Sequence, residues 1–222
     1  MKDNLKLIYI SYYFPPIHSV ASLRNYFLVS RLKEKSDQTV VLTTTNQFLF
    51  PRSDLPTEDL KILSIKTIDY RTLSNIFKFD KRQAHFSESS KSNKLFKFII
   101  KLNETFPFNL FLGEGGLVYI FISFYKARKF LKSGNIQSDI LITPFRPMSN
   151  VIIGFLLKTF YSKMRWVVSV HDLPINHFRP NVYFKKLQHN IWNRIFTQAD
   201  YVITLSHGLA NDLKTFGANA SV

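Results

Sequence analysis

Short apolar runs alternate with longer amphipathic patterns along most of the chain. The short runs combine β-branched and other apolar residues, which predicts buried strands; they cover residues 5–11, 39–44, 61–66, 139–143, 166–170 and 201–205. The longer patterns place apolar residues three or four positions apart, which predicts helices; these begin near residues 19, 116, 149, 182 and 208. This alternation favours an α/β fold with a Rossmann-like, doubly wound and mostly parallel sheet. We expect the buried strands to carry Ile8, Val41, Ile142, Val168 and Ile203.

The stretch from residue 70 to residue 104 interrupts this alternation. It contains eight Lys or Arg residues, three acidic residues and five Phe, and its centre is rich in Ser. Because Ser-rich polar stretches form loops, we interpret residues 70–116 as a basic, Phe-rich insertion of helices and loops. Its Phe and Lys side chains either contact an anionic membrane or, in the alternative interpretation, pack under the domain as a small additional core.

The composition is that of an ordinary globular protein, with 45% hydrophobic and 20% charged residues in a chain of 222. Cys is absent, which excludes disulfide bonds, thiolate metal sites and a Cys nucleophile, and fits a reducing compartment. The longest apolar stretches, residues 117–125 and 151–157, are shorter than the roughly 20 residues of a membrane-spanning helix. The N-terminus does not resemble a signal peptide. We therefore expect a cytoplasmic protein, with peripheral contact to the inner face of the cell membrane as an extension of that expectation.

The charge balance is unusual, because 30 Lys and Arg stand against 15 Asp and Glu and give a formal net charge of +15. Such a basic protein is expected to meet a polyanion: nucleic acid, an anionic bilayer or a phosphate-bearing substrate. The alternative explanation of the charge is an AT-rich genome, which favours codons for Lys, Asn, Ile and Phe. No zinc-finger spacing or RNA-recognition signature is present, so we expect no specific nucleic-acid partner.

The candidate chemistry lies where the predicted strands end, because ligands of open parallel sheets bind beyond the carboxyl ends of the strands. His171 and Asp172 follow the strand at residues 166–170 and are our candidate catalytic residues, since such a pair can bind sugar hydroxyls or serve in acid–base chemistry. The candidate substrate-binding residues at the other strand ends are Pro16, His18, Ser19, Arg24, Arg146 and Ser206. Some also have a plainer interpretation: a rigid turn for Pro16, a solvated helix position for Arg24 and a helix cap for Ser206.

Residue spacing excludes several kinds of site. The six His residues show no i,i+4 pair and no HExxH pattern, so no metal site is expected. The chain has no G-x-G-x-x-G fingerprint, no P-loop and no G-x-S-x-G elbow. We therefore expect no bound cofactor.

Four segments occur in an order that resembles a known enzyme family. They are residues 13–16 with Arg24, residues 111–116, residues 167–174 and residues 199–209. Together they extend over nearly the whole chain and resemble the N-terminal domain of family 4 glycosyltransferases, which are retaining enzymes of the GT-B fold.

The resemblance implies a two-domain enzyme in which the N-terminal domain binds the acceptor and a C-terminal domain binds a nucleotide-sugar. Sugar transfer in the cleft between them retains the anomeric configuration and needs no obligatory metal. The position that matches His171 lines the cleft near the transferred sugar, and the loop that matches residues 16–19 faces the donor diphosphate. Residues 17–20 of this chain stand where many relatives carry a glycine pair.

On this basis we expect residues 1–222 to be a single Rossmann-like glycosyltransferase N-terminal domain without its donor-binding domain, because the family's paired-glutamate donor motif has no counterpart. The expected function is to bind the acceptor in hexosyl transfer during synthesis of a cell-surface polysaccharide or glycolipid. We expect the chain to be inactive without a donor-binding domain. The expected partners are a sugar or lipid-linked acceptor and a nucleotide-sugar co-substrate held by the missing domain. The alternative is a non-catalytic domain that binds an anionic membrane surface or polymer.

Overall fold

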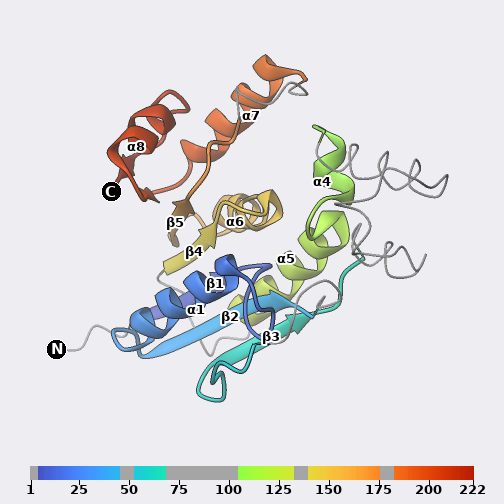
Figure 1. Ribbon diagram of the computed structural model, residues 1–222, viewed down its shortest axis with the longest axis vertical. Coiled ribbons are helices and arrows are strands. Elements are labelled where there is room, and N and C mark those ends of the chain that lie inside the picture. The colour runs from blue at the N-terminus through green and yellow to red at the C-terminus, as the bar shows by residue number, and fades with distance from the viewer. Residues whose placement is uncertain (1–4, 46–52, 69–104, 133–139, 176–182) are drawn as a thin grey trace, which may run out of the picture.

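Parallel strands form one seven-stranded sheet within the residues that the structure describes (Figure 1). The structure is a computed structural model, and it describes residues 5–45, 53–68, 105–132, 140–175 and 183–222. The strands are β1 (Lys6–Ile10), β2 (Gln38–Thr44), β3 (Lys61–Ile65), β4 (Ile140–Pro144), β5 (Arg165–Val170), β6 (Tyr201–Thr204) and β7 (Ala220–Ser221). Their order in the sheet is β3-β2-β1-β4-β5-β6-β7, and each neighbouring pair is parallel. The predicted Rossmann-like α/β fold is confirmed.

Helices connect the strands and cover the two faces of the sheet. They are α1 (Val20–Lys33), α4 (Phe108–Leu112), α5 (Gly116–Lys132), α6 (Met148–Phe160), α7 (Lys185–Phe196) and α8 (His207–Lys214). The helix α1 packs on one face beside β1 and β2, whereas α5, α6 and α7 pack on the other (Figure 1). Of the predicted insertion, residues 70–104 lie outside the described residues, and residues 105–116 contain α4 and reach the first residue of α5.

The strands are apolar on both faces, as expected for a parallel sheet with helices on each side. Four of the five residues predicted for buried strands are buried, but Ile203 in β6 is 46% exposed. The prediction is wrong for Ile203 because its neighbours Val202 and Thr204 point to the covered face. Ile203 points to the opposite face, where α1 covers β1 and β2 instead.

The strand order reverses between β1 and β4. These two strands are direct neighbours, yet β1 is followed in sequence by β2 on one side and β4 by β5 on the other. Ligands of open α/β sheets bind at such a switch point, beyond the carboxyl ends of the strands. The segments that follow β1, β4 and β5 therefore form the candidate site.

Candidate functional site

The loop after β1 is fixed by the first turns of α1. Ser19 caps this helix, because its hydroxyl oxygen accepts a hydrogen bond from the backbone N–H of Ser22 at 3.1 Å. Further along the helix, the buried Asn25 donates from Nδ2 to Ser11 Oγ and to the Tyr13 carbonyl oxygen, both at 2.8 Å. The loop between β1 and α1 is therefore held against the helix.

A second buried asparagine joins the loops after β1 and β4. Asn150, near the start of α6, accepts at Oδ1 from the backbone N–H of Tyr12 at 3.0 Å. Its Nδ2 donates to the carbonyl oxygens of Pro144 at 3.2 Å and Arg146 at 3.4 Å. Asn150 is fully buried, so these bonds replace the water that its amide loses on folding. One side chain thus sets the spacing between two strand ends at the switch point.

Three of the predicted substrate-binding residues lie in the loop after β1. The carbonyl oxygen of Pro16 accepts a hydrogen bond from the backbone N–H of Ser53 at 2.7 Å, and the hydroxyl of Ser19 is used as the helix cap. The side chain of His18 is exposed. His18 is thus the one of these three whose side chain is open to a ligand.

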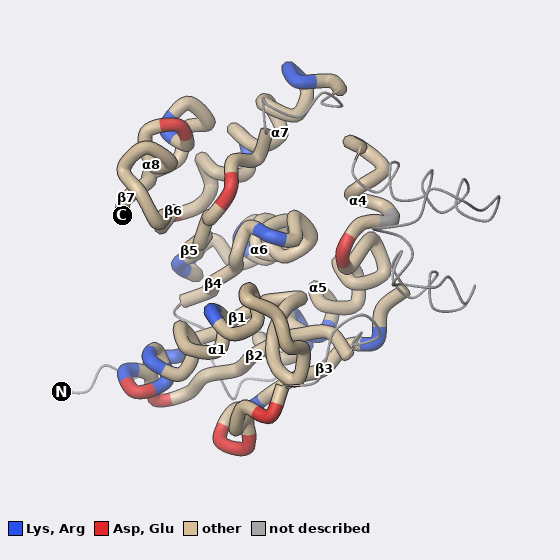
Figure 2. The backbone as a smooth tube through the Cα atoms, in the orientation of Figure 1, with Lys and Arg blue, Asp and Glu red and all other residues tan. Residues whose placement is uncertain are grey.

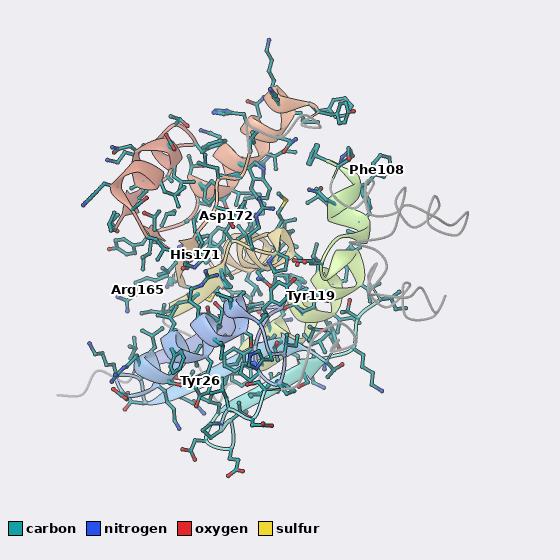
Figure 3. The ribbon with its side chains drawn as sticks, viewed as in Figure 1. Tyr26, Phe108, Tyr119, Arg165, His171 and Asp172 are labelled. Atoms are coloured by element: carbon teal, nitrogen blue, oxygen red, sulfur yellow. The ribbon has the colours of Figure 1, made fainter. Side chains whose placement is uncertain are left out.

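Arg24 on α1 and the pair His171 and Asp172 after β5 lie within electrostatic reach of one another; Figure 3 labels His171 and Asp172 beyond the end of β5. Burial lowers the pKa of Arg24, and the nearby Tyr9 and Asp172 counteract part of this shift. In His171, burial and then the Arg24 cation lower the pKa to about 4, against a smaller opposing effect of Asp172. Residues far apart in the sequence therefore meet at one edge of the sheet.

The low pKa of His171 leaves its imidazole neutral near pH 7. Ring atom Nε2 lies 3.1 Å from Ser169 Oγ, and this contact orients the ring. A neutral imidazole has one donor and one acceptor nitrogen. His171 can therefore form a hydrogen bond with a ligand hydroxyl, but it does not carry the proton of a general acid.

Two buried nitrogen atoms of this group have no hydrogen-bond partner within the described parts of the chain. They are Nε of Arg24 and Nδ1 of His171. An unpaired buried polar group costs about 1–3 kcal/mol, and folded proteins pair the great majority of such groups. Because both atoms lie at the edge where ligands of this fold bind, the oxygen atoms of a bound ligand are suitable partners.

Arg146 and Ser206 lie at the same edge of the sheet but make other contacts. Nη2 of Arg146 donates to the Leu173 carbonyl oxygen at 3.4 Å, and the guanidinium lies 5.3 Å from the centre of the Phe145 ring. Ser206 accepts from the backbone N–H of Leu209 at 3.2 Å as the cap of α8. Ser206 therefore acts as a helix cap, which is the simpler of the two interpretations of this residue.

Arg146 also lines a pocket of about 150 Å³ between α4, the start of α5 and the start of α6. Asn109, Glu114 and Ser149 contribute polar groups to this pocket, and the buried Oδ1 of Asn109 has no partner among the described residues. The sequence does not predict this pocket. Its lining comes from three elements, and no motif or spacing marks those residues as neighbours.

The described residues offer neither a metal site nor a membrane span. Within the described ranges, no group of His, Asp and Glu side chains is arranged to hold a metal ion. No helix in those ranges combines the length and apolar character needed to cross a bilayer.

Comparison with known proteins adds no family assignment. No protein-family model matches the chain, and no curated protein matches its sequence. The function is therefore argued from the geometry of the site and from the ordered motifs in the sequence.

Proposed function

We propose that this chain is the acceptor-binding domain of a retaining, nucleotide-sugar-dependent glycosyltransferase. The observation that carries the proposal is the meeting of Arg24 and His171 at the switch-point edge, each with a buried nitrogen that lacks a partner. A nucleotide-sugar offers hydroxyl and phosphate oxygens to both groups. The order of the motifs around these residues supports the same reaction class.

His171 and Asp172 are assigned to the transferred sugar. The neutral imidazole forms one hydrogen bond through Nδ1 with a sugar hydroxyl, and the exposed carboxylate of Asp172 accepts from a neighbouring hydroxyl. His171 positions the sugar and does not protonate it, because a pKa of about 4 leaves the ring neutral near pH 7.

Arg24 is assigned to the negative charge that develops on the leaving group. Retaining transfer breaks the bond between the anomeric carbon and the diphosphate, so charge accumulates on the diphosphate oxygens. Arg24 is half-buried, and a cation in less polar surroundings interacts more strongly with that charge than a fully solvated one. The acceptor, a sugar or lipid-linked sugar of a cell-surface polysaccharide or glycolipid, approaches along the same edge.

The test is consumption of UDP-glucose and GDP-mannose by the purified chain, alone and together with a separately expressed donor-binding domain of family 4. We expect no turnover by the chain alone, because the family's donor site lies in the second domain. Turnover that needs both polypeptides supports the proposal.

Robust turnover by the chain alone would contradict the assignment, because the donor would then bind within these residues. Absence of turnover with the donor-binding domain would also count against transfer. That second result would favour a non-catalytic domain that binds an anionic membrane surface or polymer.

A further inference from the structure

The helix α5 presents an aromatic face that no described part of the chain covers. Val118, Phe121 and Tyr125 follow one another at helical spacing and are 37%, 64% and 66% exposed. Monomeric proteins rarely expose adjoining apolar side chains of this size unless the surface has a partner.

Exposed apolar residues also lie on the elements that contact the two ends of α5. The carbonyl oxygens of Ile68 and Phe111 lie against Gly116 at the start of α5, and both side chains are exposed. At the other end, the exposed Phe160 ring lies 5.5 Å from the ring of Phe124. We call the resulting surface the α5 face; it consists of Ile68, Phe111, Val118, Phe121, Tyr125 and Phe160.

Beyond its aromatic part, α5 carries only basic charges. The second half of α5 carries Lys126, Arg128, Lys129 and Lys132, and no Asp or Glu occurs within the helix. Lys129 and Lys132 are exposed one and two turns beyond Tyr125, and the Arg128 guanidinium lies 5.0 Å from the centre of the Phe160 ring. Among the described residues, Glu114 at the corner before α5 is acidic and lies at the opposite end of the helix from these basic residues, and Figure 2 shows the other acidic positions on other elements.

We propose that the α5 face rests on an anionic lipid bilayer. Aromatic side chains enter the boundary between headgroups and acyl chains, while Lys and Arg contact anionic headgroups. Each basic residue near such a surface contributes about 1 kcal/mol. The aromatic half of α5 followed by its basic half, with no acidic residue in the helix, matches this chemistry.

A bilayer contact at the α5 face would bring the membrane close to the candidate site. The start of α5 and the adjacent α4 line the pocket that contains Arg146, at the carboxyl edge of the sheet. A bilayer against the α5 face would therefore lie beside the candidate site, and a lipid-linked acceptor could reach it from the membrane. This use rests on the proposed function, whereas the lipid contact itself does not.

The experiment is sedimentation of the full chain with vesicles of phosphatidylglycerol and phosphatidylcholine, and with vesicles of phosphatidylcholine alone. The double variant Phe121→Ser, Tyr125→Ser should lose about tenfold or more of its partition into anionic vesicles. The matched control is Phe27→Ser, because Phe27 is 59% exposed on α1, on the opposite face of the sheet. It should sediment like the parent chain.

A second pair of variants tests the charges. Lys129→Glu with Lys132→Glu should weaken binding, and added salt should reduce the difference from the parent because it screens surface charge. Lys35→Glu with Lys214→Glu changes the net charge equally at exposed positions elsewhere and should have a much smaller effect. Urea unfolding of every variant checks that the fold is retained.

Three results would overturn the proposal. The first is a parent chain that binds no anionic vesicles, which would point to an acidic protein as the partner of the α5 face. The second is equal binding to phosphatidylcholine alone. The third is binding that survives the α5 variants but is lost when Lys91, Lys94, Lys97 and Lys101 are changed to Glu, because residues 70–101, which lie outside the described residues, would then make the contact. The assay uses no sugar donor, so a failure of the proposed transfer reaction would leave its outcome unchanged.

Discussion

At the scale of single residues, the protonation of His171 should couple stability to pH. Its pKa is about 4 in the folded chain, whereas an ordinary His has a pKa of about 6.5. Between these values the unfolded chain binds a proton that the folded chain does not, so the free energy of unfolding falls as the pH drops from about 6.5 to 4. We expect His171→Gln to weaken this fall, as measured by urea unfolding at a series of pH values.

The control for this measurement is His207→Gln, because His207 is exposed at the start of α8. This variant makes the same substitution outside the candidate site. If the parent and His171→Gln lost stability equally on acidification, His171 would be protonated in the fold as readily as in water. The neutral hydrogen-bonding role that we assign to it would then be wrong.

The sequence predicts which residues follow the strands, but it does not predict the orientation or the contacts of their side chains. The Arg24 cation lies close enough to His171 to lower the pKa of its imidazole, as expected when strand ends share one edge. Arg146 instead stacks on a Phe ring and lines a separate pocket. Asn25 and Asn150 could not be predicted as loop anchors, because an Asn near a helix start usually indicates a cap or a solvated position. Their burial depends on neighbours that only the fold supplies.

At the scale of elements, α6 packs closely on β5 because Gly154 has no side chain. A Cβ atom at this position would lie 2.6–2.8 Å from atoms of the Trp166 indole, which is fully buried and donates to Thr143 Oγ1 at 2.9 Å. We expect Gly154→Ala to destabilise the chain by about 1–3 kcal/mol through overpacking, despite the higher helix propensity of Ala. Urea unfolding followed by circular dichroism measures the change.

The matched control is Gly208→Ala in α8, where a Cβ atom would meet nothing within 4 Å. Ala at this position should leave stability unchanged or raise it by up to about 1 kcal/mol, because Gly is the poorer helix former. Equal effects of the two substitutions would show that the contact between α6 and Trp166 can adjust without cost.

Elements with a strong apolar pattern were predictable, and weakly patterned ones were not. The strands from β1 to β6 all carry the expected short apolar runs, since parallel strands bury both faces. β7 is only two residues long, too short to show a pattern. The exposure of Ile203 in β6 could not be predicted either, because an apolar run does not reveal which of its faces lacks a covering helix.

At the scale of the whole molecule, the structure shows where basic residues lie, whereas the composition gives only their number. The net charge of +15 is equally compatible with nucleic acid, a bilayer or phosphate-bearing substrates. In the structure, basic residues on α5 continue an aromatic surface, and a second site places a half-buried arginine beside a neutral histidine. The fold thus places basic residues in two separate surroundings, one beside the aromatic side chains of α5 and one at the switch point, which are the places of the two proposed contacts.

The central claim, that the strand-end residues around His171 hold the transferred sugar, is tested most directly by the transfer rate of His171→Ala. The assay combines the chain with a donor-binding domain, and His189→Gln on α7 serves as the histidine control. We predict that His171→Ala lowers kcat by about a hundredfold, as loss of a preorganised hydrogen bond does in other enzymes, while circular dichroism and the KM for the acceptor change little. A His171→Ala variant that transfers sugar as fast as the parent and the His189→Gln control would contradict the account.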